Sequence, residues 1–393
     1  MAPSPPFVSF VVPTYNAARL LPRCLASIRK QRYPRQRYEI IVADGLSEDG
    51  TAEVARAFGA TVVWNHRRDA QIGKACGIAA ARGEFIALLD ADNEIVQEDW
   101  LPRLLEPLLR HPHVMGVESD LLVPPGDYFM NRYCALLRLE DPVARCLGLL
   151  RRQVSVTWHA STLAPPATRN GSPAARYALL TVKPGRAPVF GANGFLWRRE
   201  VLLQAPGVAA SFDEADAANA LLLAGHRTVA LVPGVGIYHH HIRSVGQFWR
   251  KRLRTGSEFL ARRRRKGGGP ERLWTSRAAR PRQLYAVLQP LTLVAPLLES
   301  LDGLRRTRDP AWLAHLPVAL GSLAIYGFCL LFTAFTGRDP QGVLQRLQAG
   351  GCDRPPSASG APASTPPEPS NVPRGTIAAT HGRHWGSATE LVS

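Results

Sequence analysis

The sequence has no cysteine arrangement that would organise a fold. Its six cysteines are spread over 393 residues, and their spacing is not that of a metal site. This excludes a zinc ribbon and a disulfide-stapled secreted scaffold, and it predicts reduced thiols in a cytosolic protein. A secretory signal is not expected either, because the Pro-rich residues 1–6 lead directly into an apolar run that is typical of a strand.

Acidic residues are scarce in one part of the chain. The whole sequence holds 48 Lys and Arg against 31 Asp and Glu, a net charge of +17. Residues 243–282 contain fourteen of the basic residues and two of the acidic ones, which is 14 − 2 = +12. Such a basic belt indicates a polyanionic partner, which is either nucleic acid or the anionic face of a membrane.

Apolar, β-rich runs alternate with helical patterns in the first hundred residues. The runs occupy 7–16, 38–45, 60–65 and 84–92, and the helical patterns 17–31, 51–59 and 71–83. This alternation predicts an α/β fold built from βαβ units around a parallel sheet. Ligands of open sheets bind at the carboxyl ends of the strands. The first site candidates are therefore the polar residues at those ends, Thr14, Asn16, Asp44, Asn65, Asp90 and Asp92.

Two apolar stretches follow the basic belt. Residues 312–335 carry no formally charged side chain over 24 positions, so they are predicted to form a transmembrane helix, with a buried soluble helix as the alternative. Residues 284–301 include Gln289, two prolines and Glu299, and they can be a span, a re-entrant segment or an interfacial helix.

Arginines flank both apolar stretches. Arg277, Arg280 and Arg282 precede the first one, and the positive-inside rule then places the N-terminal domain in the cytoplasm, at the inner (plasma) membrane. Arg305, Arg306 and Arg308 lie between the stretches and would be outside if both crossed; a dipping first segment removes this conflict. The belt is therefore interpreted as juxtamembrane and lipid-facing. No nucleic-acid-binding module is recognised.

A pair of carboxylates ends the run at 84–92. Asp90 and Asp92 are expected where a buried strand meets a loop, and two carboxylates there can converge on Mg²⁺ or Mn²⁺. Without a cation they would repel each other at a cost of several kcal/mol. The alternative is that one of them caps the next helix, expected over residues 93–109.

Several segments in order resemble the family 2 glycosyltransferases, inverting enzymes with the GT-A type nucleotide-sugar fold. The resemblance covers roughly residues 7–255. It rests on VVPTYNAARLLPRCLASI (11–28), IIVADGLSEDGT (40–51), GIAAARGEFIALLDADN (77–93), GANGFLWRREVL (191–202), FDEA (212–215) and VPGVGIYH (232–239). It implies a mixed, mostly parallel sheet with helices on both faces, followed by C-terminal membrane helices.

The resemblance also implies domain boundaries. A GT-A domain is expected over 1–242, a basic juxtamembrane segment over 243–283, and one or two membrane segments over 284–337. Residues 338–393, rich in Pro, Ser and Ala, are expected to form a disordered tail.

The family pattern implies a donor site at the carboxyl edge of the sheet. Pro13, Thr14 and Tyr15 would line the nucleotide pocket, with core packing as the alternative for Tyr15. Asp44 would hydrogen-bond base or ribose, Asp90 would approach ribose or sugar, and Asp92 would hold the metal. Lys74 occupies a basic position of the family, and Asn193 lies in the matching GANGF segment. These substrate-binding and metal-binding assignments are carried over from the pattern alone.

The resemblance places an acidic pair before a helix that ends near Gly225. Glu214 falls on the position of the catalytic base, Asp213 is its close rival, and capping of the helix by Asp213 or Asp216 is the alternative. The base would take a proton from an acceptor hydroxyl in a single displacement.

Later basic and imidazole groups complete the expected site. His239 is a possible metal or diphosphate ligand, and strand alternation puts it on the same side as His241, opposite His240. Arg250 or Lys251 can contact the diphosphate. Because Lys251 stands where processive members have Trp, one transfer per encounter is expected rather than a long polymer.

Taken together, the sequence predicts a membrane-anchored hexosyltransferase-like enzyme of cell-envelope biosynthesis. Its partners would be a nucleoside-diphosphate-sugar donor and a membrane lipid or lipid-linked acceptor, without nucleic acid. Two alternatives remain: a catalytically inactive, membrane-tethered scaffold that binds nucleotide sugars, and a nucleotidyltransferase, for which the N-terminal VVPTYNAARL lacks the required phosphate loop.

Overall fold

The computed structural model describes residues 4–137, 141–143, 177–182, 190–191, 193–264, 280–338, 340 and 342. Within these residues the strands are β1 (Val8–Thr14), β2 (Tyr38–Asp44), β3 (Thr61–Trp64), β4 (Phe85–Leu88), β5 (Asn93–Ile95), β6 (Val114–Leu121), β7 (Ala178–Thr181), β8 (Phe195–Arg198) and β9 (Thr228–His239). The predicted tail lies outside the described residues from 343 onward.

The helices alternate with strands as the sequence predicts. They are α1 (Leu21–Arg29), η1 (Arg35–Arg37), α2 (Thr51–Ala57), α3 (Ala70–Ala80), α4 (Trp100–Arg110), α5 (Phe129–Leu137), α8 (Arg199–Leu202), α9 (Glu214–Leu223), α10 (Val245–Arg264), α12 (Arg280–Leu291), α13 (Val294–Thr307), η3 (Pro310–Ala314) and α14 (His315–Thr336). Gly225, with φ +101°, follows α9 as expected of a helix stop.

The strands form one mixed sheet in the order β3-β2-β1-β4-β8-β6-β9-β5, and β7 also pairs with β9. Strands β1 to β4 are parallel to one another, and β9 is parallel to β6. Strand β8 runs antiparallel between β4 and β6, and β5 and β7 run antiparallel to β9. Six strands therefore share one direction and three oppose it, which confirms a mixed, mostly parallel sheet.

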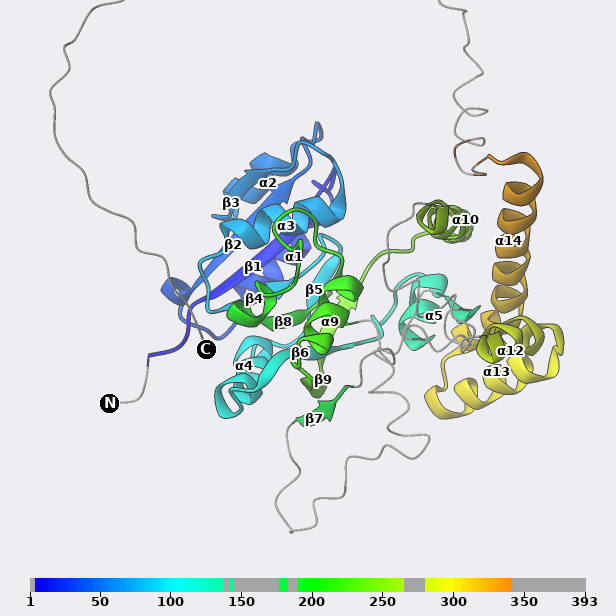
Figure 1. Ribbon diagram of the computed structural model, residues 1–393. Coiled ribbons are helices and arrows are strands. Elements are labelled where there is room, and N and C mark those ends of the chain that lie inside the picture. Colours follow the sequence, from blue (N-terminus) through cyan, green and yellow to red (C-terminus); the bar gives the residue numbers. More distant parts are fainter. Residues whose placement is uncertain are drawn as a thin grey trace, which may run out of the picture. The chain divides into compact units, whose positions relative to one another are not determined.

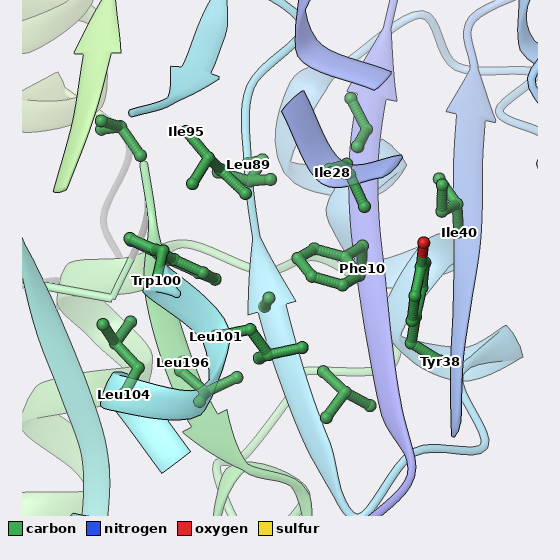
Figure 2. Packing of buried hydrophobic residues seen from close by; sticks show 14 of the residues in the cluster. Phe10, Ile28, Tyr38, Ile40, Leu89, Ile95, Trp100, Leu101, Leu104 and Leu196 are labelled. Atoms are coloured by element: carbon green, nitrogen blue, oxygen red, sulfur yellow. The ribbon is translucent and has the colours of Figure 1, made fainter. Parts of the chain in front are cut away.

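Helices cover both faces of the sheet (Figure 1). Side chains alternate along β1, so that Phe10 and Val12 face one way and Val11 the other. On the first face Phe10 packs with α1 and α4, including the fully buried Trp100 (Figure 2). On the second face α3, α8 and α9 pack around Trp197 of β8. The two apolar layers fix the sheet, and with it the edge where the strands end.

The C-terminal helices lie side by side with one another and with α5 and α10. Among the described residues, Pro310–Thr336 is long and apolar enough to cross a membrane, and 28% of its most apolar window is buried. The stretch predicted at 284–301 is not one straight helix. It is divided into α12 and α13, which are bent by 78° at the break between them.

Candidate functional site

A short turn at the carboxyl edge of β4 carries the two predicted carboxylates. The backbone amide of Asp90 donates to Asn93 Oδ1 at 2.9 Å, and the amide of Asn93 donates back to the carbonyl of Asp90 at 2.9 Å. Asn93 Nδ2 also donates to Asp92 Oδ1 at 3.3 Å. The buried Asn93 side chain therefore closes the turn and sets the direction of both carboxylates.

The chain after this turn differs from the expectation. Residues 93–95 form β5 instead of the first turn of a helix, and α4 begins only at Trp100 after Asp99. Neither Asp90 nor Asp92 is therefore a helix cap. The reason is tertiary, because β5 pairs with the end of β9, a partner that local sequence patterns do not reveal.

This pairing brings His239 to the two carboxylates. Asn93 lies opposite His239 in the ladder, and the amide of His240 donates to the carbonyl of Asp92 at 2.9 Å. His239 Nε2 is 3.2 Å from Asp92 Oδ1. Ligand atoms of Asp90, Asp92 and His239 all lie within 4.8 Å of one another. Two carboxylates and one imidazole therefore converge from β9 and the β4–β5 turn.

The neighbouring histidines divide as strand alternation predicts. The rings of His239 and His241 stack with centroids 4.1 Å apart. His240 turns to the other side, where its two ring nitrogens meet Asp127 Oδ2 at 2.8 Å and Glu94 Oε2 at 2.9 Å. The end of β9 is thereby fixed to β5 and to the residues just before α5, which holds His239 in place.

The charges of the cluster act on one another. Burial opposes ionisation of Asp92, but the charge and hydrogen bond of His239, together with the charges of His241 and Lys251, lower the pKa of Asp92 to about 2. Burial raises the pKa of Asp90; Lys74 opposes this rise and the charge of Asp92 adds to it. Asp90 therefore gains from any additional positive charge placed beside it.

A second pair of charges lies next to this cluster. Lys74 of α3 is almost completely buried, and its Nζ is 3.1 Å from Glu214 Oε2 at the start of α9. Burial disfavours the charged lysine, yet attraction to Glu214 and Asp90 outweighs burial and raises the pKa of Lys74. Lys74 therefore interacts with both the predicted base, Glu214, and a predicted metal ligand, Asp90.

Asp213 has a different position from Glu214. Its Oδ1 accepts a hydrogen bond of 3.1 Å from the backbone amide of Asp216, three residues on, which is the geometry of an N-cap. The structure thus assigns the capping position of α9 to Asp213. Of the two acids, Glu214 is the one that reaches Lys74.

The predicted nucleotide side of the site lies at the ends of β1 and β2. Thr14 Oγ1 donates to Asp44 Oδ1 at 2.8 Å, and Ser47 donates to both Asp44 oxygens from its hydroxyl and its amide. Asp44 is fully buried, so it organises the loop after β2. Pro13, the register partner of Ala43, packs beside Gly73 of α3. The predicted contact of Asp44 with base or ribose stays a prediction.

Tyr15 is half exposed rather than a core residue. The guanidinium of Arg68 lies 5.6 Å from its ring centroid, and a Cβ at Gly45 would touch its ring at 3.3 Å. A flat aromatic surface with a cation above it is suited to stacking on a planar group. Arg68 was not singled out from the sequence, because its loop between β3 and α3 carries no motif.

Asn193 and Arg250 have contrasting environments. Asn193 has φ +51°, and its Oδ1 is buried without a hydrogen-bond partner among the described residues. The same loop passes Glu214, since a Cβ at Gly191 would lie 3.3 Å from Glu214 Cβ. Arg250 of α10 is exposed, and the adjacent Lys251 is the basic residue whose charge acts on Asp92.

The cluster is chemically suited to a hard divalent cation. Carboxylate oxygens are preferred by Mg²⁺ and Mn²⁺, and an imidazole nitrogen is compatible with Mn²⁺. Burial raises the pKa of Asp90, so a cation beside this carboxylate would offset the cost of its buried charge. Asp90, Asp92 and His239 therefore fit the divalent metal that the sequence implies.

Comparison with protein families identifies the N-terminal part of the chain. Residues 9–119 match the model described as "Glycosyl transferase family 2". This segment is a family 2 glycosyltransferase domain. It contains β1 to β6 and the Asp90–Asp92 turn, whereas Glu214 and His239 lie beyond the matched residues.

Curated relatives of the glycosyltransferase domain cover only part of this chain. Glycosyltransferase AglE of Haloferax volcanii is 34% identical over 162 residues, which are 38% of this chain and 53% of that protein. A dolichyl N-acetylglucosaminyl phosphate glucuronosyltransferase of Methanococcus voltae is 28% identical over 28% of this chain and 38% of that protein. The chain thus spans about half or less of the length of these relatives.

A solved structure resembles a larger part of the chain at lower identity. The mannosyltransferase PcManGT of Pyrobaculum calidifontis, in complex with GDP-Man and Mn²⁺, matches with a TM-score of 0.44 and 19% identity. The match covers 88% of this chain and 80% of PcManGT.

Proposed function

We propose that the chain transfers a sugar from a nucleoside-diphosphate-sugar to a hydroxyl acceptor, with inversion and with the help of Mg²⁺ or Mn²⁺. The observation that carries the proposal is one constellation at the carboxyl edge of the sheet. Asp90, Asp92 and His239 converge there, and the Lys74–Glu214 pair interacts electrostatically with Asp90. A family 2 glycosyltransferase domain provides the frame for this constellation.

The donor side uses the β1 and β2 edge. Tyr15 would stack on the base while Pro13 and Thr14 line the pocket, and the buried amide oxygen of Asn193 would accept a hydrogen bond from the sugar. A metal held by Asp90, Asp92 and His239 would act as a Lewis acid for the charge that develops on the departing diphosphate. Lys251, or Arg250 beside it, would add positive charge at that group.

The acceptor side uses Glu214. As general base, its carboxylate takes the proton of the acceptor hydroxyl while that oxygen attacks the anomeric carbon from the face opposite the leaving group. One displacement of this kind inverts the anomeric centre, so the chain needs no covalent nucleophile. The ammonium of Lys74 supports the role by holding the carboxylate in place.

The acceptor class is proposed from location. The apolar Pro310–Thr336 supports attachment to a membrane, with the catalytic domain on the cytoplasmic side of the inner membrane. The M. voltae relative, whose name specifies a dolichyl-phosphate-linked substrate, supports a lipid-linked or cell-envelope acceptor.

The test is a transfer assay with the full chain in membranes. UDP-, GDP- and dTDP-sugars are supplied with Mn²⁺ or Mg²⁺, and product formation is measured together with donor hydrolysis. We expect transfer from one donor class, loss of transfer in Asp92→Ala and Glu214→Gln, and little change in Glu106→Gln, whose carboxylate pairs with Arg110 on α4. Unchanged transfer in both site variants would refute the mechanism.

A further inference from the structure

The bent pair α12–α13 is too short and too sharply turned to cross a bilayer as one helix. The 12 residues of α12 and the 14 of α13 correspond to about 18 Å and 21 Å of helix, against a hydrocarbon core of about 30 Å. The axes are bent by 78°. Leu293 at the break has φ +60°, and Pro290 and Pro296 on either side remove backbone donors that a continuous helix would need.

The two helices bury their small and polar residues and expose their large apolar ones. On α13 the buried residues are Pro296, Ser300 and Gly303, and Gly303 lies against the Trp312 ring, where a Cβ would approach to 2.2 Å. The exposed side chains of the pair are Leu284, Tyr285, Val287, Leu288, Leu291, Val294, Leu297, Leu298 and Leu301, each at least 44% exposed. In a water-soluble helix pair the arrangement would be the opposite.

Polar contacts hold the bend against the rest of the chain. Gln289 Nε2 donates to Glu299 Oε1 at 3.1 Å across the break, and Glu299 Oε2 is 3.0 Å from His315 Nε2 of α14. His315 Nδ1 in turn meets the Tyr133 hydroxyl of α5 at 2.9 Å. These contacts support the bent shape, because straightening it would separate Gln289 from Glu299.

The charges at the end of α13 identify the partner. Arg305, Arg306 and Arg308 are exposed immediately after the apolar face, where they can reach lipid phosphates. If α12 and α13 crossed the membrane together, the same arginines would lie on the far side, against the positive-inside rule.

We propose that α12 and α13 form a re-entrant hairpin that enters one leaflet of an anionic bilayer and returns to the side of the catalytic domain. The apolar face lies among the acyl chains, and Arg305, Arg306 and Arg308 lie at the headgroups of the same leaflet. The proposal goes beyond the proposed transfer reaction and does not depend on it.

The first test is topology, in the full chain in sealed vesicles. Cys76, Cys146 and Cys352 are replaced by Ser, while the buried Cys24, Cys134 and Cys329 are kept. A single cysteine is then introduced by Arg308→Cys, or by Glu200→Cys on the catalytic domain as the reference. An impermeant maleimide should label both from the same side of the membrane. Labelling from opposite sides would overturn the proposal, because residues 284–307 would then span.

The second test is depth, in the same background. Leu298→Cys and the matched control Leu109→Cys, which are 59% and 56% exposed, carry bimane in vesicles that contain anionic lipids and doxyl-labelled acyl chains. We expect strong quenching at position 298 and none at 109. Equal, weak quenching at both positions would overturn the proposal and indicate that protein covers the face, either a second copy or residues 343–393. Lowering the protein-to-lipid ratio should restore quenching if a second copy covers the face. Deletion of residues 343–393 should restore it if that segment does.

Discussion

Lys74→Met isolates the ion pair between α3 and the start of α9. Lys74 Nζ and Glu214 Oε2 are 3.1 Å apart, and the two side chains are 8% and 25% exposed. At this distance the Coulomb attraction is about 5 kcal/mol for an effective dielectric constant of about 20. Desolvation offsets much of that attraction, but removal of one partner leaves an uncompensated charge, which costs about 3–5 kcal/mol in a fully buried pair. Because Glu214 keeps some contact with water, we expect the variant to lose about 2–3 kcal/mol of stability.

The loss should not depend on pH over the usual assay range. The folded-state pKa of Lys74 is raised above its ordinary value of 10.5. The stabilising contribution of a raised lysine is fully present below the unfolded-state value and disappears only as pH rises through the folded-state value. The difference in stability between Lys74→Met and the parent chain should therefore be the same at pH 7 and pH 9.

The assay combines melting curves with kinetics. A loss of this size lowers the Tm of a domain of 150–250 residues by about 4–12 °C, whereas Lys30→Met, an exposed lysine on the surface, should change it little. In the double variant with Glu214→Gln the penalty should partly disappear, because position 214 then carries no charge. If Lys74 positions the base, kcat falls; if Lys74 instead binds the substrate, as the family pattern implies, the donor KM rises.

Two results would refute this account. One is a Tm for Lys74→Met equal to that of Lys30→Met. The other is a coupling energy between the Lys74 and Glu214 substitutions below about 0.5 kcal/mol, the limit within which independent sites add.

Three further predictions concern the same edge of the sheet. Asp92→Asn should weaken Mn²⁺ binding by at least about tenfold, since even residues that only hydrogen-bond to a metal ligand contribute that much. In paramagnetic titrations the control Asp302→Asn, at an exposed position, should bind Mn²⁺ normally, and equal binding by both variants would exclude Asp92 as a ligand. Mn²⁺ should raise Tm at pH 7 and much less near pH 4, because the raised pKa of Asp90 lets protons compete while the pKa of Asp92, about 2, keeps that group charged; the same rise at both pH values would contradict this. Asn193→Gly should raise the donor KM with little change in Tm, because the buried oxygen has no partner among the described residues and glycine tolerates the φ of +51°; a lower Tm with unchanged KM would assign the side chain a structural role.

The first four strands were predictable because their signals are local. Three of the four apolar runs end within a residue or two of the observed strand end, so that the run 7–16 becomes β1 (Val8–Thr14) and 38–45 becomes β2 (Tyr38–Asp44). The run 84–92 continues four residues beyond the end of β4 (Phe85–Leu88). Strands β1, β2 and β4 are buried on both faces, which makes them largely apolar and easy to recognise. Their polar ends then meet at one edge, which is how Thr14 and Asp44 come to share a hydrogen bond.

Two short strands of the sheet could not be predicted in the same way. Strands β5 and β8 are three and four residues long, and each forms only because it pairs with a strand that is distant in the sequence. Asn93 pairs with His239 across more than 140 residues, and Phe195 pairs with Leu88 across more than 100. Short segments have no periodicity of their own, so their state is decided by tertiary contacts.

Lys74 shows where physical chemistry adds to a family pattern. It lies between Gly73 and Ala75 on the face of α3 that packs under β1, where a Cβ at Gly77 would come within 2.3 Å of Val11. A lysine on so close a contact face cannot keep its charge without an acidic partner. That need follows from the sequence QIGKACGIAA, but the identity of the partner does not, because Glu214 is 140 residues away. The fold supplies the acid, and Lys74 thereby interacts with both the proposed base and a proposed metal ligand, while its substrate contact stays a prediction.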